Sequence, residues 1–166
     1  AREDAAVRRA ALIESAELYE KAGDLAAASR AWERFVERYP EPFEDAWAAR
    51  GKLAGLYVEA GDLAAAGRVW ERFVAANPQR FAEGIEARQT LADYAREAGD
   101  AGARKRWLEA LIAADAAGGA ARSDRSRTLA ARAALEIAEP RRVAFEAIRL
   151  TAPLPASLKA KRDALE

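Results

Sequence analysis

The side chains that could do acid–base chemistry in this chain are its carboxylates, because its 166 residues include no His and no Cys. The sequence therefore has no Ser-His or Cys-His nucleophile pair and no ordinary zinc, haem or iron–sulfur ligands. Glu17 and Glu20 share one face of a predicted helix, and two carboxylates facing each other across a cleft can hydrolyse a glycosidic bond. An enzyme would need such a convergent cleft, whereas glutamates on helix surfaces are usually solvated. We therefore predict a protein without catalytic residues.

Three aspartates recur at a regular interval, at positions 24, 62 and 100. A row of carboxylates suggests a metal site, but each aspartate can also cap a helix by accepting a hydrogen bond from backbone N–H groups. Gly118-Gly119 lacks the Lys and the Ser or Thr that a phosphate-binding loop requires. We expect neither a metal nor a cofactor.

Arginine and tryptophan side chains also recur. Arg34 and Arg72 follow identical Trp-Glu pairs. They could grip a ligand, but pairing with acidic neighbours about one helical turn away is the simpler interpretation. We expect the tryptophans to pack in the core rather than to form a ligand platform; they are Trp32, Trp70 and Trp107.

The strongest pattern in the sequence is an internal repeat with a period of 38 residues. Residues 18–28 and 56–66 share the pattern Leu-Tyr-x-x-Ala-Gly-Asp-Leu-Ala-Ala-Ala, and Trp-Glu-Arg-Phe-Val follows both, at 32–36 and 70–74. A looser third copy contains Gly99 and is one residue shorter after its turn. This repetition predicts an array of similar structural units.

Each copy predicts two helices around a Gly-Asp turn. In the second copy, Leu53, Leu56 and Tyr57 form the apolar stripe of the first helix. Gly61 can end that helix in a left-handed conformation, and Asp62 can cap the next one. The second helix has its own stripe, made of Leu63, Ala66, Trp70, Phe73 and Val74. We predict three helix pairs over residues 1–117, with turns at 23–24, 61–62 and 99–100.

These residues resemble the tetratricopeptide repeat, or TPR. Relative to the turn glycine, the family pattern has a Tyr four residues before, a small residue five after, an aromatic nine after and a Pro seventeen after. Both clear copies fit, with Tyr19, Ala28, Trp32 and Pro40 in the first and Tyr57, Ala66, Trp70 and Pro78 in the second. The third copy departs, since Ala95 replaces the Tyr and the Pro is absent. The resemblance covers about residues 10–117 and implies an all-α fold, a right-handed α-solenoid of antiparallel helix pairs that coils into a TPR-like superhelix.

Two departures from the common repeat bear on where in the cell the protein acts. The period is 37–38 residues rather than 34, and Phe35 and Phe73 stand where a small residue is usual. Longer repeats with this Phe resemble TPR proteins of the bacterial cell envelope, such as outer-membrane assembly lipoproteins and cell-division coordinators. Residues 148–159 also resemble a segment of large myxobacterial envelope TPR proteins, some of which serve surface motility.

The last third of the chain is less regular. Gly118-Gly119 should interrupt the helical pattern, and Ser123-Asp124 can cap a helix that runs to about Ala138. Glu139-Pro140 should end that helix, before another helix that ends near Leu150. We predict a degenerate fourth helical pair over 118–151. After a break stiffened by two prolines, residues 155–166 should begin the first helix of a truncated continuation.

The resemblance also implies a groove, because similar proteins bind peptides on a concave wall built largely from first helices. The groove positions carried over from the family are Ile13, Glu17, Glu20, Lys21, Gly51, Gly55, Val58, Glu59, Gln89, Asp93, Arg96 and Glu97. Five of them are carboxylates and two are basic, so we expect a protein or peptide partner that is basic or mixed rather than acidic. Gly51 and Gly55 should each cost the helix about 1 kcal/mol relative to Ala. Either they allow two helices to approach closely, or they open the groove for a partner's backbone.

The function that follows is a non-catalytic scaffold for protein–protein interaction that assembles a bacterial envelope complex. The alternative is an architectural spacer that self-associates end to end, since the open ends of an array expose apolar faces. The 27 basic and 27 acidic residues argue against nucleic-acid binding, and no run of about 18 apolar residues predicts a membrane-spanning segment. The periplasm or envelope is the expected location, with the cytoplasm left open. Because the sequence has no Met, we expect it to be a piece of a longer product.

Overall fold

The structure is a computed structural model that describes residues 2–151 and 154–165. These residues form eight α-helices and one short 3₁₀ helix, without strands, so the predicted all-α class is confirmed. In chain order the elements are α1 (Arg2–Lys21), α2 (Leu25–Arg38), α3 (Phe43–Glu59), α4 (Leu63–Ala76), α5 (Phe81–Glu97), α6 (Ala101–Ala117), η1 (Gly119–Ala121), α7 (Asp124–Ala147) and α8 (Leu154–Asp163).

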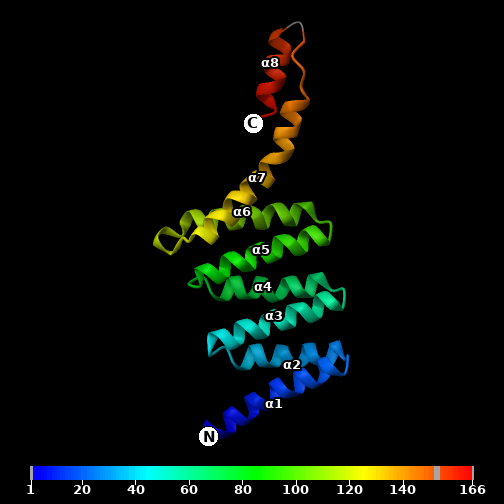
Figure 1. Cartoon of the computed structure of the whole chain (residues 1–166), viewed down its shortest axis with the longest axis vertical. Coiled ribbons are helices and arrows are strands. Elements are labelled where there is room, and N and C mark those ends of the chain that lie inside the picture. The colour runs from blue at the N-terminus through cyan, green and yellow to red at the C-terminus, as the bar shows by residue number, and fades with distance from the viewer. Residues whose placement is uncertain (1, 152–153, 166) are drawn as a thin grey trace.

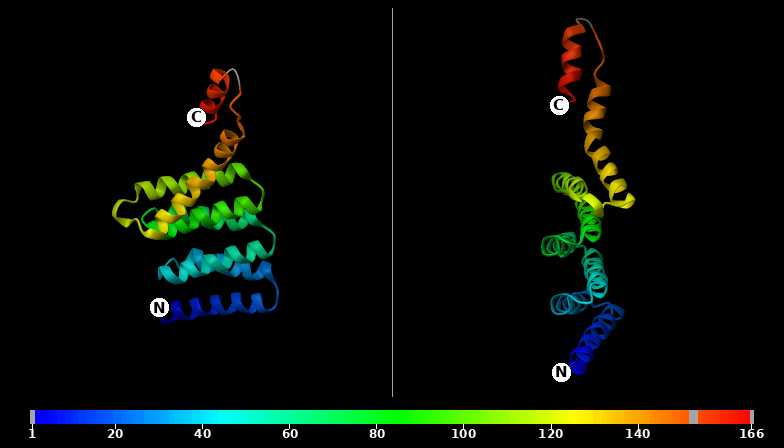
Figure 2. Two further views of the ribbon diagram at one scale, coloured as in Figure 1. Left: turned by 45° about the horizontal axis from the view of Figure 1, so that its top comes forward. Right: turned by 90° about the vertical axis from the view of Figure 1, so that its left-hand side faces the viewer.

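The helices stack in sequence order, each packed against the next, from α1 to α7 (Figure 1). From the side, α2, α4 and α6 form one column, and α1, α3, α5 and the start of α7 form another (Figure 2). This consecutive packing is that of a helical-repeat solenoid, as the sequence predicts. The odd-numbered helices up to α5 are the first helices of three pairs, and the even-numbered helices up to α6 are the second.

The same cap begins the second helix of every pair. Gly61 has a φ of +77°, which a residue with a Cβ adopts only with strain. The carboxylate of Asp62 accepts a hydrogen bond from the backbone N–H of Ala65 at 2.7 Å. The other two pairs repeat this arrangement with Gly23 and Asp24 and with Gly99 and Asp100. The regular spacing of the aspartates thus follows from helix capping.

The core is built from the repeated aromatic residues. Phe35 and Phe73 are each 1% exposed, and Trp32 and Trp70 are also buried. Trp47 of α3 packs onto α4 within the second pair, with its ring centroid 4.8 Å from that of Phe73. The prediction that the tryptophans serve packing is confirmed for the two buried ones, while Trp107 is half-buried and packs against both core clusters.

The predicted break at Glu139-Pro140 is wrong. α7 is one continuous helix from Asp124 to Ala147 with Pro140 inside it, so residues 118–151 hold a 3₁₀ turn and a single helix rather than a helical pair. Proline removes only one backbone hydrogen bond. Arg142 pairs with Glu139 before the proline and with Glu146 one turn further on, so exposed ion pairs accompany the helix through this stretch.

The end of the chain folds back beside α7. α8 lies alongside the end of α7 (Figure 1), and Lys161 Nζ donates to the backbone oxygen of Phe145 at 3.2 Å. The predicted helix over 155–166 corresponds to α8, which begins at Leu154; Ala152, Pro153 and Glu166 lie outside the described residues. Within the part of the chain that the structure describes, no helix combines the length and apolarity needed to cross a bilayer.

Candidate functional site

All twelve predicted groove residues lie on the first helices α1, α3 and α5. None of them is buried: each side chain is half-buried or exposed. We call the surface that these twelve residues define the first-helix face.

The carboxylates of α1 are partly engaged in contacts between helices. Lys52 Nζ lies 3.3 Å from Glu17 Oε1 and joins α3 to α1. The same ammonium lies 4.6 Å from the ring centroid of Trp32, whose indole N–H donates to Glu20. Glu17 therefore helps to hold the first pair against the second, and Glu20 joins the two helices of the first pair, while both contribute negative charge to the first-helix face.

The two helix glycines of α3 do not serve internal packing. A Cβ built on Gly51 or on Gly55 meets no other atom within 4 Å, and both residues are exposed. Close helix–helix approach is therefore excluded as the reason for these glycines. The glycine at which a close approach does occur is Gly118, where a Cβ would overlap the ring of Phe81.

Three predicted residues of α5 line a hollow of about 300 Å³ between α5, α6 and α7. The lining consists of Gln89, Asp93, Arg96, Arg104, Leu108, Arg125, Leu129, Arg132, Ala133 and Glu136. Four arginines thus face two carboxylates in this hollow. Three of the four form ion pairs, Arg96 with Asp93, Arg104 with Glu136 and Arg125 with Glu86. Arg132 is exposed and joins no ion pair within the described residues.

The arginines that α7 contributes to this hollow were not predicted from the sequence. Arg125 and Arg132 lie in a helix that lacks the repeat signature, so no alignment with the first three copies could place them. The one available signal was the composition after residue 120, where 10 basic residues stand against 6 acidic ones.

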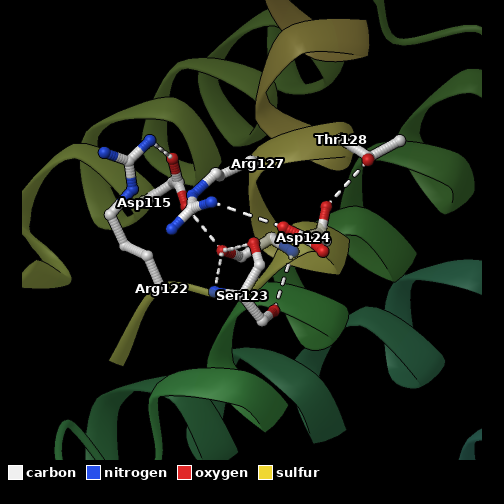
Figure 3. A network of polar contacts seen from close by, with 7 residues as sticks. Asp115, Arg122, Ser123, Asp124, Arg127 and Thr128 are labelled. Atoms are coloured by element: carbon white, nitrogen blue, oxygen red, sulfur yellow. Dashed lines mark hydrogen bonds and ion pairs between the residues drawn. The ribbon is translucent and has the colours of Figure 1, made fainter. Parts of the chain in front are cut away.

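A buried polar cluster joins α6 to α7 (Figure 3). Asp115 is 2% exposed and accepts hydrogen bonds from Ser126 Oγ and from Arg122, each at 2.6 Å. These two donors hold the pKa of the Asp115 carboxyl below its usual value. Ser123 and Ser126 form the capping box that begins α7. A carboxylate kept ionised and fully engaged in this way fixes the corner between two helices.

No metal site accompanies these carboxylates in the described ranges 2–151 and 154–165, where no three acidic side chains gather closely enough to hold an ion. The carboxylates instead cap helices, pair with arginines or face solvent.

Comparison with known families identifies the repeat directly. The family model of the tetratricopeptide repeat matches residues 10–42, which cover most of α1, all of α2 and the Gly-Asp turn between them. No curated protein matches the chain. The matched unit is the first of three helix pairs with the same cap, and it shares its buried Trp and Phe with the second pair. Residues 10–42 therefore form a repeat of the tetratricopeptide type within a chain whose consecutive helix packing is that of a helical-repeat solenoid.

Proposed function

We propose that the chain is a non-catalytic scaffold that binds a peptide segment of a partner protein on its first-helix face. Repeats of this family generally mediate protein–protein interactions. The observation that carries the proposal is the exposed backbone at Gly51 and Gly55 on α3, the middle of the three first helices. Two glycines in one helix are unfavourable, and since neither serves internal packing, a partner's backbone approaching this strip explains them.

Charge favours a peptide of mixed sign. At the α1–α3 end, Glu17, Glu20 and Glu59 attract basic residues. At the other end, the hollow between α5 and α7 has four arginines and two carboxylates and attracts acidic residues. A segment with a basic part over α1 and α3 and an acidic part at α7 would be fixed in one orientation by these charges.

The complex that we propose for this scaffold lies at a bacterial cell envelope. The support is the extended repeat: α3 and α5 have 17 residues each, and Phe35 and Phe73 are both buried core residues. Fractionation of the source cells tests this location. Recovery of the parent protein with periplasmic or membrane fractions is expected, and recovery in the cytosol alone contradicts the proposal.

Peptide display tests binding on the first-helix face. The library holds random peptides of about 12 residues, which span about 40 Å when extended. The enriched peptides are then measured by fluorescence anisotropy against the wild type and against a Glu17→Lys, Glu59→Lys variant. The matched control is Glu71→Lys, Glu109→Lys, which makes the same charge change at exposed positions of the second helices α4 and α6.

We expect enriched peptides to carry Lys or Arg and to bind the first variant about tenfold more weakly, while the control binds like the wild type. In the peptide experiment, either the absence of any enrichment or equal affinity for all three proteins overturns the proposal. A rise in molar mass with concentration in light scattering, abolished by the first variant but not by the control, also overturns it in favour of a self-associating spacer.

A further inference from the structure

Two hollows flank α2 on the side of the molecule away from the first-helix face. The larger, of about 600 Å³, lies between α1 and α2, and the other, of about 390 Å³, lies between α2 and α4 over α3. Glu37 of α2 lines both. Six arginines line the pair of hollows and define what we call the arginine face: Arg8, Arg34, Arg38, Arg50, Arg68 and Arg72.

The arginine face and the first-helix face lie on opposite sides of the same helices. On α3, residues 50, 53 and 57 line the hollow, whereas the first-helix face has positions 51, 55, 58 and 59. At about 100° per residue, the two sets point about 150° apart around the helix axis. The two faces can therefore hold two partners at the same time.

The six arginines have no acidic partner. Within residues 2–151 and 154–165, none of them joins an ion pair or donates a side-chain hydrogen bond, so the pairing with acidic neighbours that the sequence suggested for Arg34 and Arg72 is wrong. Arg50 is half-buried, with its guanidinium carbon 5.5 Å from the ring centroid of Phe73, and burial lowers its pKa. Arg104 and Arg142, by contrast, each engage carboxylates directly.

The charge of this face is opposite to that of the first-helix face. Six arginines stand against two glutamates, a net charge of +4, in a chain whose formal net charge is zero. Glu33 is already engaged, because its Oε1 accepts a 2.6 Å hydrogen bond from the Tyr57 hydroxyl. Glu33 is held in place by this bond and keeps its charge, so the two glutamates together offset only two of the six cations.

The walls of the hollows are apolar between the arginines. Leu12 lines the first hollow, and Val36, Leu53, Val69 and Phe73 line the second. Such walls suit inserted aliphatic or aromatic side chains. A phosphate backbone has no apolar side chain to place there, and Glu37 in the shared wall would repel a continuous row of phosphates.

We propose that the arginine face binds an acidic segment of a partner protein, with apolar side chains in the two hollows and carboxylates on the surrounding arginines. Guanidinium groups pair with carboxylates in a two-pronged geometry, which gives both strength and direction to such contacts. This site is separate from the first-helix face and goes beyond the function proposed above. It makes the chain an adaptor between two segments of opposite charge.

The test uses display on a chain whose first-helix face is already altered, so that the two proposals fail independently. Random peptides of about 12 residues are selected on the Glu17→Lys, Glu59→Lys variant. An enriched peptide is then measured by anisotropy against the wild type and an Arg34→Ser, Arg68→Ser, Arg72→Ser variant. The control variant, Arg106→Ser, Arg141→Ser, Arg149→Ser, loses the same charge at exposed positions elsewhere.

We expect the enriched peptides to combine Asp or Glu with apolar residues, to bind the arginine-face variant on the order of tenfold more weakly than the control, and to bind less tightly as salt rises. Enrichment of peptides without acidic residues, or equal affinity for both variants, overturns the proposal. So does binding of a single-stranded oligonucleotide or of phosphatidylglycerol vesicles through these arginines in place of any peptide. Light scattering gives one more outcome that overturns the proposal. If the wild type self-associates and only the arginine-face variant abolishes this, the face binds a second copy of the chain.

Discussion

The hydroxyl of Tyr57 donates a 2.6 Å hydrogen bond to Glu33 Oε1 and thereby joins the first helix of the second pair to the second helix of the first. Tyr57 is one of the residues that carry the resemblance to the tetratricopeptide repeat. Its equivalent in the first pair, Tyr19, is 42% exposed and forms no such bond within the described residues. In this chain the repeated Tyr therefore has different roles in different copies, depending on whether a pair precedes it.

Tyr57→Phe should destabilise the protein by about 1 kcal/mol, because it removes a hydrogen bond between two pairs without changing the packed ring. Urea unfolding followed by circular dichroism measures this loss. Tyr19→Phe is the matched control and should leave the free energy of unfolding unchanged. An equal effect of the two substitutions would show that the contact with Glu33 contributes nothing.

Tyr57 should also titrate later than an ordinary tyrosine. Burial, together with its hydrogen bond to Glu33, raises the pKa of Tyr57 to about 12 from an ordinary 10. Because the folded pKa is raised, the stabilisation is complete below pH 10 and is lost as the pH rises from about 10 towards 12. Ultraviolet titration should show a late phenolate transition that is missing in Tyr57→Phe. If the transition that disappears in Tyr57→Phe lies near pH 10 rather than near pH 12, the assignment is contradicted.

Glycine-to-alanine substitutions should have opposite effects on stability inside α3 and in the turn that follows it. Gly51→Ala and Gly55→Ala should each stabilise the protein by about 1 kcal/mol, since the new methyl group meets open space in an ordinary helix. Gly61→Ala should destabilise it by about 1–2 kcal/mol, because φ is +77° there. Thermal unfolding measures all three. If the exposed strip of α3 receives a partner, the first two variants also bind a selected peptide more weakly, which separates a functional role from a structural one.

Stability in acid should depend on Asp115. Its pKa lies below the usual 3.8 because Arg122 and Ser126 donate to its carboxylate. The stabilisation is therefore present above pH 4 and is lost as the pH falls through the lowered pKa. Asp115→Asn should lower the melting temperature at pH 7 and flatten its decline in acid. Glu139→Gln, at an ion-paired but solvent-exposed carboxylate, is the control and should leave the acid decline in place. Identical pH profiles for Asp115→Asn and wild type would contradict this role.

Pro140→Ala should strengthen the second half of α7. Proline in a helix interior costs about 3 kcal/mol relative to Ala, and the exposed position 140 offers no compensating burial. Amide hydrogen exchange within residues 136–147 should slow in the variant. Exchange that stays the same or quickens there would mean that the proline is accommodated without loss.

The sequence predicts the repeated part of the fold well and the rest less well, for physical reasons. In the three pairs the left-handed glycine and the capping aspartate recur together, and in the first two the buried Trp and Phe recur with them, so each signal supports the others. α7 has no such redundancy, and a single strong signal, Pro140, suggested a break, whereas the helix continues through that residue.

The candidate surfaces show the same division. The positions of the first-helix face were carried over from the family pattern, and all of them lie outside the core on α1, α3 and α5. The arginine contribution of α7 and the unpaired arginines around α2 depend on which side chains meet across helices, and periodicity within one helix does not contain that information.

The central claim is that the first-helix face receives a peptide. The most direct measurement is a titration of ¹⁵N-labelled protein with a display-selected basic or mixed peptide, followed by amide chemical shifts. We predict that the largest shifts occur at Gly51, Gly55 and Val58, with smaller ones on α1 and α5 and little change on α2 and α4. Shifts confined to α2 and α4, or an unchanged spectrum at saturating peptide, would contradict the claim.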